Sequence, residues 1–488
     1  MRKFIVLLLL GIMFSFLKAE NPGNDFLKCV DRVNIDNDII ARPGNYITVS
    51  IKFTEPMDAD REVSGRLVLS GSSDLILTGG SWMNGGTLWR FKPVKLNTIA
   101  GMGRLHISGA KTRETELMMQ EESVPVCVGV QPLIERVKKM GEWMMKNPNS
   151  HLFVEGYNLR TLLGIYEITG EQKYLNYVKN SISRLISAQK PEGYWGTGYG
   201  DVYFADTASA LAILINYYKY ASSSEKRDID TALNKYIKLL LVTGDDKGQP
   251  FVHKGGSVGV GFSTDKQGKI TTSLNKPYTI ATALTGAEIF AAMYYLTDKD
   301  SYKGISIKAC EWIINTMDIS GRIPTYSYQG EHWEPFRKDI DFVWRWPYNS
   351  AAYAGEGFIA AWTYIDDPDF RTELEQRVRI NIEWILRTQN QDGSWSDYGS
   401  QQQLRSHGVV NLLVWYYQNV FNDPHIAHAI QRYYLLLLDE PRSKYLRIPG
   451  DYQVPVKSVG TIGTAIAGRA LVDIIKPGVD CNRWKEKE

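Results

Sequence analysis

The densest group of chemically capable side chains in this sequence is the stretch 331–349. It reads Glu331-His-Trp-Glu-Pro-Phe-Arg-Lys-Asp-Ile-Asp-Phe-Val-Trp-Arg-Trp-Pro-Tyr-Asn349, with four acidic residues, one histidine, two arginines, three tryptophans and one tyrosine. Aromatic rings stack against the C–H faces of sugars, and polar groups beside them bind the hydroxyls. The stretch therefore predicts a carbohydrate site.

Other segments add side chains of the same kinds. The candidates for substrate binding are Trp195, Tyr199, Asp201, His253, Trp344, Trp395 and Arg405. The cations that accompany them are Lys254, Lys276, Arg345 and Arg405. Because arginine binds carboxylate or sulfate groups through two parallel hydrogen bonds, these cations favour an acidic sugar as the substrate.

Side chains of these types fit β-elimination from a uronic acid residue. The proton next to the carboxylate is weakly acidic, so an enzyme must neutralise that carboxylate, and Arg345 and Asn349 are the candidates. Imidazole titrates near neutral pH, which makes His332 or His407 the candidate base. Tyr348, or Tyr199 in its place, is the candidate that protonates the leaving oxygen. No cofactor is needed for this reaction.

Two other functions fit the same residues. A glycoside hydrolase, such as one acting on unsaturated uronides, needs two carboxyl groups around the scissile bond. Candidates for such a pair are Asp201, Asp206, Glu331, Glu334 and Asp341. The third possibility is a carbohydrate-binding or surface protein on a degenerate toroid, without catalysis. We expect no metal site, since His425 and His428 have no third ligand in evident reach.

Twelve helical stretches follow residue 128, and they alternate between two styles. Six are amphipathic: 132–146, 172–189, 224–241, 301–317, 370–389 and 424–438. The other six are apolar on all sides: 156–169, 207–220, 279–296, 350–364, 406–420 and 458–475. Helices of the second style are buried and those of the first face solvent. The alternation predicts an (α/α)6 toroid over residues 130–478, with catalysis placed in this domain.

The connections between these helices are asymmetric. Turns from an apolar helix to the next amphipathic one are short, whereas the return segments 190–206, 242–278, 318–349, 390–405 and 439–457 are long. All long segments therefore lie at one end of the ring, above the N-termini of the inner helices. Long ordered loops in a compact domain usually carry function, so we place the site at this end.

A repeat supports the ring. Gln189-x-x-x-Gly193-Tyr-Trp195 and Gln389-x-x-x-Gly393-Ser-Trp395 each close an amphipathic helix, 200 residues apart. The repeat resembles the Gln–Trp turns of terpene-cyclase toroids and similar turns in helical pectate lyases. With the residue types above, the domain resembles secreted polysaccharide-degrading toroid enzymes, especially polysaccharide lyases. This resemblance implies an (α/α) toroid that degrades an acidic polysaccharide.

Residues 25–128 have a different pattern. Tyr46–Phe53 and Gly65–Ser70 alternate between apolar and polar residues, and glycine-rich turns separate such runs. The pattern predicts an antiparallel β-sandwich. Phe53-Thr-Glu-Pro-Met-Asp58 followed by Ser81-Trp82 and Thr87-Leu88-Trp89 resembles bacterial Ig-like modules of secreted proteins, which implies a spacer or docking role.

Composition and the first residues limit the remaining possibilities. The 488 residues carry a net charge of +2, which argues against a nucleic-acid partner. Residues 1–19 combine Arg2 and Lys3 with an apolar run, which predicts a cleaved signal peptide and a secreted or periplasmic, monomeric protein without a membrane span. The sequence leaves open whether Cys29 and Cys127 form a disulfide, while Cys310 is expected to be a buried apolar residue.

Overall fold

The computed structural model describes residues 29–36, 38–69, 74–96, 100–149, 151–196, 201–325, 347–395, 406–438 and 458–478. The chain forms two compact units. One consists of Met1–Asp36 with Gly44–Val126, and the other of Asn37–Pro43 with Cys127–Glu488. The predicted signal peptide lies outside the described residues.

The first unit contains two antiparallel sheets. One sheet has the strand order β1-β2-β6-β5 with β7 beside β2, and the other has the order β4-β3-β8-β9. The strands are β1 (Val30–Asp36), β2 (Tyr46–Phe53), β3 (Ser64–Leu69), β4 (Leu75–Leu77), β5 (Gly80–Met83), β6 (Leu88–Phe91), β7 (Val94–Lys95), β8 (Gly101–Ser108) and β9 (Glu122–Val128).

Alternation along these strands builds the core of the first unit. In β2 the buried side chains include Ile47, Val49 and Ile51, and Phe91 of β6 reaches Gly65 of β3 in the other sheet. Side chains of period two thus fill the space between the sheets. The antiparallel strands are as the sequence predicted, whereas the relation to Ig-like modules stays a prediction.

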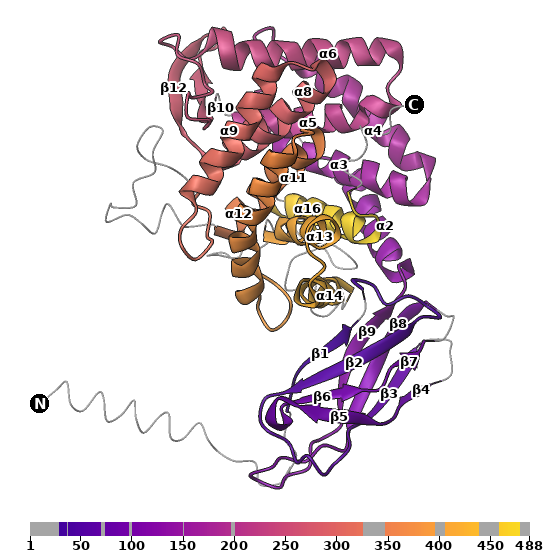
Figure 1. Ribbon diagram of the computed structural model, residues 1–488. Helices are drawn as coiled ribbons and strands as arrows, with labels where there is room; N and C mark the ends of the chain where they lie inside the picture. The colour runs from indigo at the N-terminus through magenta and orange to yellow at the C-terminus, as the bar shows by residue number, and fades with distance from the viewer. Residues whose placement is uncertain are drawn as a thin grey trace, which may run out of the picture. The chain divides into compact units, whose positions relative to one another are not determined.

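The second unit is built from pairs of helices (Figure 1). The inner helices are α3 (Leu152–Thr169), α5 (Phe204–Tyr217), the continuous segment α7 (Thr279–Ala281), η4 (Thr282–Ile289) and α8 (Phe290–Thr297), then α11 (Pro347–Tyr364), α13 (Val409–Asn419) and α16 (Ser458–Ile475). The outer helices are α2 (Gln131–Lys146), α4 (Gln172–Ala188), α6 (Ser223–Lys238), α9 (Asp300–Thr316), α12 (Pro368–Arg387) and α14 (Pro424–Leu438). The twelve predicted helices are therefore confirmed, with ends shifted by a few residues.

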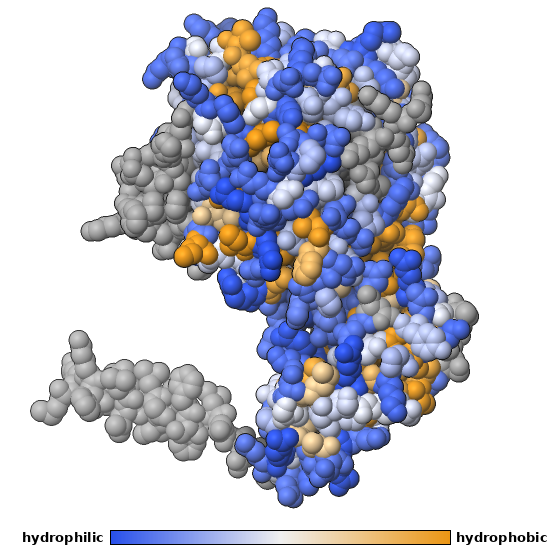
Figure 2. Space-filling view, viewed as in Figure 1, coloured by the Kyte–Doolittle hydropathy of each residue, from blue (hydrophilic) through white to orange (hydrophobic). Residues whose placement is uncertain are grey.

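The inner helices form a closed ring. Each packs against the next one along the chain, and α16 packs back against α3. Every residue of α5 is buried. In contrast, only the apolar face of α6 is buried. On the face shown in Figure 2, hydrophilic residues cover most of the outer helices. Burial of apolar area thus holds the two layers together, as the two helix styles predicted.

Small residues allow the inner helices to approach closely. A Cβ atom at Gly156 of α3 would lie 2.6 Å from the carbonyl oxygen of Ser209 in α5. A Cβ atom at Gly357 of α11 would lie 2.8 Å from the carbonyl oxygen of Ala283 in η4. Such distances are too short for any side chain, so glycine is required at both crossings.

Charged side chains meet inside the ring, on four different inner helices. Glu356 of α11 accepts hydrogen bonds from Tyr157 Oη at 2.9 Å and Arg160 Nη1 at 3.1 Å, both on α3. The Oε1 atom that accepts from Tyr157 also lies 2.8 Å from Arg469 Nη1 of α16, and Arg160 Nη2 donates to Glu288 of η4 at 2.9 Å. Two arginines and two glutamates thus balance within the core. We call these four residues with Tyr157 the axial cluster.

One type of turn recurs after four outer helices. In each, the N–H of the first residue donates to the carbonyl of the fifth, and a glycine with positive φ occupies the fourth position. The turns are 190–194, 253–257, 318–322 and 390–394, with glycines Gly193, Gly256, Gly321 and Gly393. A Cβ atom on each glycine would come within 2.3–2.5 Å of a carbonyl oxygen of the next outer helix. The turn therefore links neighbouring pairs around the ring.

The long segments contain strands that the sequence analysis did not predict. β10 (Asp201–Tyr203), β11 (Gly259–Thr264) and β12 (Ile270–Pro277) form a small antiparallel sheet beside α5. Phe262 of β11 packs on Phe204 and Phe251, with ring centroids 5.8 and 5.6 Å away. The sheet thereby covers the start of α5.

Cysteines and the most apolar helix complete the description. Cys29 and Cys127 are both buried thiols with no bond between them, and burial raises the pKa of Cys127 to about 12. Cys310 is buried in α9, as expected. Among the described helices, Thr279–Thr297 is long and apolar enough to cross a membrane, and 83% of that window is buried inside the protein.

The axial cluster generates a stability prediction. Replacing Glu356 with Gln leaves Arg160 and Arg469 buried with one carboxylate between them, so we expect a loss of about 3–5 kcal/mol in the free energy of unfolding, measured by urea titration. The matched control is Glu383→Gln, which removes the exposed pair with Arg379 and should cost less than about 1 kcal/mol. Equal stability of the two variants would contradict the role assigned to the cluster.

Candidate functional site

Each inner helix begins after a segment that comes from an outer helix. α3 begins at Leu152, α5 at Phe204 and α11 at Pro347. Helix N-termini present unpaired N–H groups and favour anionic groups. Polar side chains at this end of the ring are therefore the candidates for chemistry.

His151 and Asp206 form a pair at this end. Nε2 of His151, the N-cap residue of α3, lies 3.8 Å from Oδ2 of Asp206 in the first turn of α5. The side chain of His151 is 31% exposed and that of Asp206 is 12% exposed. Because α3 packs directly against α5, the ring itself brings together residues that are far apart in sequence.

This pair has the composition of a base and its supporting acid. An imidazole beside a carboxylate is held in one orientation, and its protonated form is stabilised by the negative charge. About a third of the His151 side chain is exposed, and because its Nδ1 is buried, Nε2 is the ring nitrogen left for a ligand to reach. The arrangement can accept a proton from a bound molecule.

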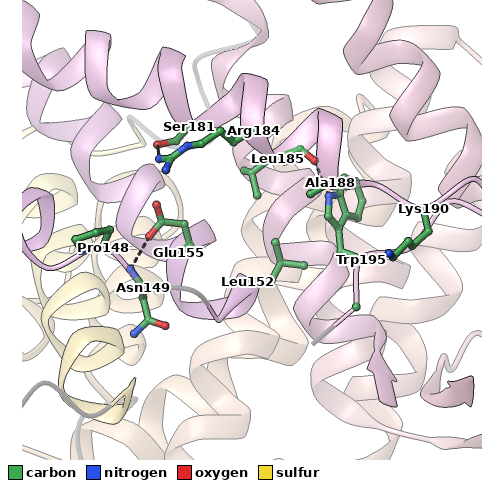
Figure 3. Close-up of a pocket in the computed structure, with 11 residues that line it drawn as sticks. Pro148, Asn149, Leu152, Glu155, Ser181, Arg184, Leu185, Ala188, Lys190 and Trp195 are labelled. Carbon is green, nitrogen blue, oxygen red and sulfur yellow. Dashed lines mark hydrogen bonds between the residues drawn. The ribbon is translucent and has the colours of Figure 1, made fainter. Parts of the chain in front are cut away.

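A cavity of about 680 Å³ lies between the first turns of α3 and the last turns of α4 (Figure 3). Asn149 and Leu152, which lie close to His151 along the chain, line it, whereas His151 and Asp206 themselves do not. The volume of the cavity falls within the range of about 300–1,000 Å³ that is usual for small-molecule sites. The lining residues are Pro148, Asn149, Leu152, Glu155, Ser181, Arg184, Leu185, Ala188, Lys190, Trp195 and Gly196. We call it the α3–α4 cavity.

Glu155 is the acid of this cavity. Burial raises the pKa of its carboxyl, and hydrogen bonds from Asn149 N at 3.3 Å and Asn158 Nδ2 at 3.4 Å oppose the shift in part. The positive charge of Arg184 opposes it as well. A carboxyl whose pKa is raised by burial within a cavity is a typical candidate for acid–base chemistry.

Two cations face the same cavity. Arg184 donates to Ser181 Oγ at 2.8 Å and interacts with the hydroxyl of Tyr177. Figure 3 shows Arg184 above Glu155, with Lys190 beside Trp195 on the other side of the cavity. Cationic, aromatic and amide groups thus share one cavity, and of its lining residues only Trp195 was among the predicted site residues.

The two tryptophans of the sequence repeat have the same structural role. Nε1 of Trp195 donates to the carbonyl oxygen of Leu185 at 2.7 Å, and Nε1 of Trp395 donates to that of Ile385 at 2.8 Å. Both rings are almost fully buried. Both are packing anchors, and Trp195 in addition lines the α3–α4 cavity.

The repeat glutamines also match each other. Gln189 Nε2 donates to Gly193 O at 3.0 Å and to Ala232 O at 2.9 Å. Gln389 Nε2 makes the same two bonds, to Gly393 O and Ala429 O, both at 2.9 Å. The sequence repeat thus corresponds to one structure repeated at two places in the ring.

His253 and Asp201 are not among the residues that line the α3–α4 cavity. His253 begins one of the repeated turns, and its ring nitrogens lie 2.7 Å from Ser257 Oγ and 2.9 Å from Asn275 Oδ1. Asp201 is the first residue of β10, opposite Ser263 of β11. His253 therefore fixes a turn, and the substrate contacts expected of both residues stay predictions.

Tyr348 and Asn349 begin α11, but their surroundings differ from the expectation. The ring of Tyr348 stacks on Trp384 of α12 with centroids 4.6 Å apart, and its hydroxyl donates to the carbonyl of Thr388 at 3.4 Å. Asn349 is fully buried. Tyr348 thus faces an outer helix in the manner of a packing residue, and no described contact supports its role as a proton donor.

His407 is buried at the start of the fifth inner helix. Its ring centroid lies 5.5 Å from that of Tyr433, and burial lowers the pKa of its imidazole to about 4. Among the described residues, Nε2 of His407 has no hydrogen-bond partner. The ring is therefore neutral at pH 7 but enclosed, which makes it a poorer base than the exposed His151.

Eight predicted site residues lie outside the described part of the chain. Five belong to the predicted elimination site, His332, Arg345, Trp344, Tyr199 and Arg405, and three to the candidate carboxyl pair, Glu331, Glu334 and Asp341. Within the described ranges, no group of three or more histidine, cysteine and acidic side chains is placed to hold a metal ion. The described candidate site consists of the His151–Asp206 pair and the α3–α4 cavity.

Comparisons with known proteins find structures whose backbones partly resemble that of this chain. No protein-family model and no curated protein sequence matches the chain. A family 76 glycoside hydrolase from a bovine Bacteroides thetaiotaomicron strain is 11% identical, with a TM-score of 0.47, over 91% of this chain and 99% of that one.

Two further solved structures cover the chain less fully. A polysaccharide lyase is 15% identical, with a TM-score of 0.49, over 70% of this chain and 97% of that one. A family 88 glycosyl hydrolase from Bacteroides vulgatus is 14% identical, with a TM-score of 0.49, over 71% and 98%. At such identities and TM-scores the likeness carries no information about activity.

The buried state of His407 generates a pH prediction. Because its folded-state pKa is lowered from 6.5 to about 4, the unfolded chain binds the proton first as pH falls. The His407 contribution to stability is therefore present above pH 6.5 and is lost between pH 6.5 and about pH 4, by a total of about 3 kcal/mol. His407→Phe should remove this loss in urea titrations at several pH values. The control His425→Gln, at an exposed residue, should keep it; parallel pH profiles for wild type and His407→Phe would contradict the assignment.

Proposed function

We propose that the chain is an exported enzyme that degrades an acidic polysaccharide or oligosaccharide by β-elimination. One observation carries the proposal: a partly exposed histidine, paired with a carboxylate, lies beside a cavity with arginine, lysine and tryptophan in its lining. The pair supplies a base, and the lining supplies groups that recognise an anionic sugar. The predicted signal peptide supports export.

The proposed step uses His151 as the base. Its imidazole takes the proton on the carbon next to the uronate carboxylate, while Asp206 stabilises the imidazolium that forms. The electron pair of the broken C–H bond becomes the new C=C bond. The glycosidic C–O bond breaks, and the leaving oxygen is protonated by water or by an acid of the site. Neutralising the carboxylate lowers the barrier, and Arg345 remains the predicted group for that task.

Burial distinguishes His151 from the base predicted earlier. His407 is enclosed by its helix and by Tyr433, so a sugar reaches its ring only after local opening. His151 needs no such rearrangement because about a third of its side chain is exposed. The proposal therefore assigns the base to His151 and leaves His332 as the alternative.

Glycoside hydrolysis is the second candidate, and Glu155 favours it. These enzymes usually have two carboxyl groups in different surroundings, of which one is protonated and the other is charged. Burial raises the pKa of Glu155, whereas Asp206 lies beside His151. The two functions leave different products, because elimination creates a C=C bond conjugated to the carboxylate and hydrolysis does not.

Substitution of the pair tests the proposed reaction. We expect His151→Ala to lower turnover of a cleavable uronic-acid polysaccharide by about 10²–10⁴-fold, because the base is lost. Asp206→Asn should lower it by a smaller factor and shift the acidic limb of the pH–rate profile to lower pH, because the imidazolium loses its stabilising charge. The measurements are ultraviolet absorbance of the unsaturated product and reducing ends.

The matched control is His425→Ala, which removes an exposed histidine of an outer helix and should leave turnover unchanged. Reducing ends without absorbance would replace elimination by hydrolysis. The absence of both signals on a broad panel of acidic polysaccharides would leave a carbohydrate-binding surface protein. Full activity of His151→Ala would remove this residue from the reaction.

A further inference from the structure

The α3–α4 cavity contains charges that the proposed reaction does not use. Glu155 follows His151 by one helical turn, with its N–H bonded to the His151 carbonyl at 3.0 Å, so the cavity adjoins the pair. Among its eleven described lining residues there are two cations, Arg184 and Lys190, and one acid, Glu155. One positive charge is therefore left over when all three are ionised.

The two cations can be reached by a ligand. Among the described residues no carboxylate lies within ion-pair distance of Arg184 or Lys190, and both residues are exposed to solvent. Arg184 has a hydrogen bond to Ser181 and the hydroxyl of Tyr177 nearby. Ser181 and Asn149 supply polar groups for sugar hydroxyls on the same walls.

We propose that this cavity is a subsite for an anionic sugar unit, and that Glu155 takes up a proton when the unit binds. The inference deepens the proposed function and rests on it for the choice of a sugar as the ligand. The anionic substituent, a carboxylate or a sulfate, would occupy the space between Arg184 and Lys190. The apolar face of the sugar would contact the wall formed by Leu152, Leu185 and Ala188, which the buried ring of Trp195 supports from behind.

The proton uptake follows from the charges around Glu155. It is faced by Arg184 and Tyr177 from α4, by Asn158 from its own helix, and by Asn149 from the preceding segment. Burial already favours the neutral carboxyl, the hydrogen bonds from Asn149 and Asn158 oppose this, and the positive charge of Arg184 adds to that opposition. An anion that binds Arg184 takes that positive charge away from Glu155 and adds a negative one. Both changes favour protonation of the carboxyl.

The sign of the pH dependence is fixed by this coupling. If the complex binds more protons than the free protein, affinity for the anion must rise as pH falls through the range in which Glu155 is charged in the free protein. Arginine and lysine keep their charges throughout this range. A subsite made of cations alone would show no such rise.

Calorimetric titration of the full-length wild-type protein tests the subsite. The probes are D-glucuronate, D-glucose 6-sulfate and D-glucose, each in two buffers with different ionisation enthalpies. We expect either anionic sugar or both to bind, with proton uptake and with an affinity that rises as pH falls, and glucose to bind at least about ten-fold more weakly. The two anionic probes decide between carboxylate and sulfate.

Variants separate the residues. Glu155→Gln should bind the anionic sugar about ten-fold more tightly at pH 7.5 and lose the proton uptake, because the competing carboxylate is gone. Arg184→Met should bind it at least about ten-fold more weakly. Trp195→Phe should weaken binding, whereas its matched control Trp395→Phe, which removes the equivalent anchor without touching the cavity, should not.

The outcomes are distinct from those of the activity test. His151→Ala should bind the sugars as wild type does, so an inactive protein that still binds with proton uptake would leave the subsite in place and overturn only the reaction. Equal binding of glucose, unchanged proton uptake in Glu155→Gln, or no binding of any probe at millimolar concentration would overturn the subsite.

Discussion

The carboxylate of Glu356 is the contact on which the geometry of the ring depends. Apolar surfaces attract one another without direction, so helices that are hydrophobic on all sides can slide and rotate at little cost. A buried carboxylate between two arginines and a tyrosine hydroxyl is different, because any shift leaves a charge unpaired in a medium that penalises it heavily. This contact ties α3, α11 and α16 into one register, and Arg160 extends it to η4 through Glu288.

That register reaches the candidate site through α3. His151 and Arg160 belong to the same rigid segment, so fixing one end of the helix fixes the position of the other. The repeated turns act on the outer layer in the same way, since each glycine lies against the next outer helix with no room for a side chain. Trp195 closes one such turn and also lines the α3–α4 cavity, so one residue links the architecture to the cavity wall.

The sequence predicted the layers of the helical unit well and the site less well, for physical reasons. Helix burial is periodic and local, so twelve ranges could be found from neighbouring residues alone. The His151–Asp206 pair joins residues 55 positions apart, which no local pattern records. Arg184 lies on an amphipathic outer helix, where the sequence pattern predicts that a cation faces solvent and not a site. β10 to β12 are short, rich in glycine and polar residues, and their pairing depends on packing against Phe204.

The histidines of this chain show why residue type alone is a weak guide to chemistry. His407 and His332 were the predicted alternatives for the base, yet the enclosure of His407 suppresses its protonation. His151 is instead partly exposed and lies beside a carboxylate. The same holds for net charge, since a value of +2 spread over 488 residues hides a cavity with two cations against one buried acid. Burial raises the pKa of the Glu155 carboxyl. In the proposed subsite, the charge of this carboxyl therefore depends on whether Arg184 has bound an anion. A nearly neutral chain can therefore contain a cationic cavity without having a basic surface. Protonation of the one acid among the described lining residues is enough to leave the two cations of the cavity uncompensated.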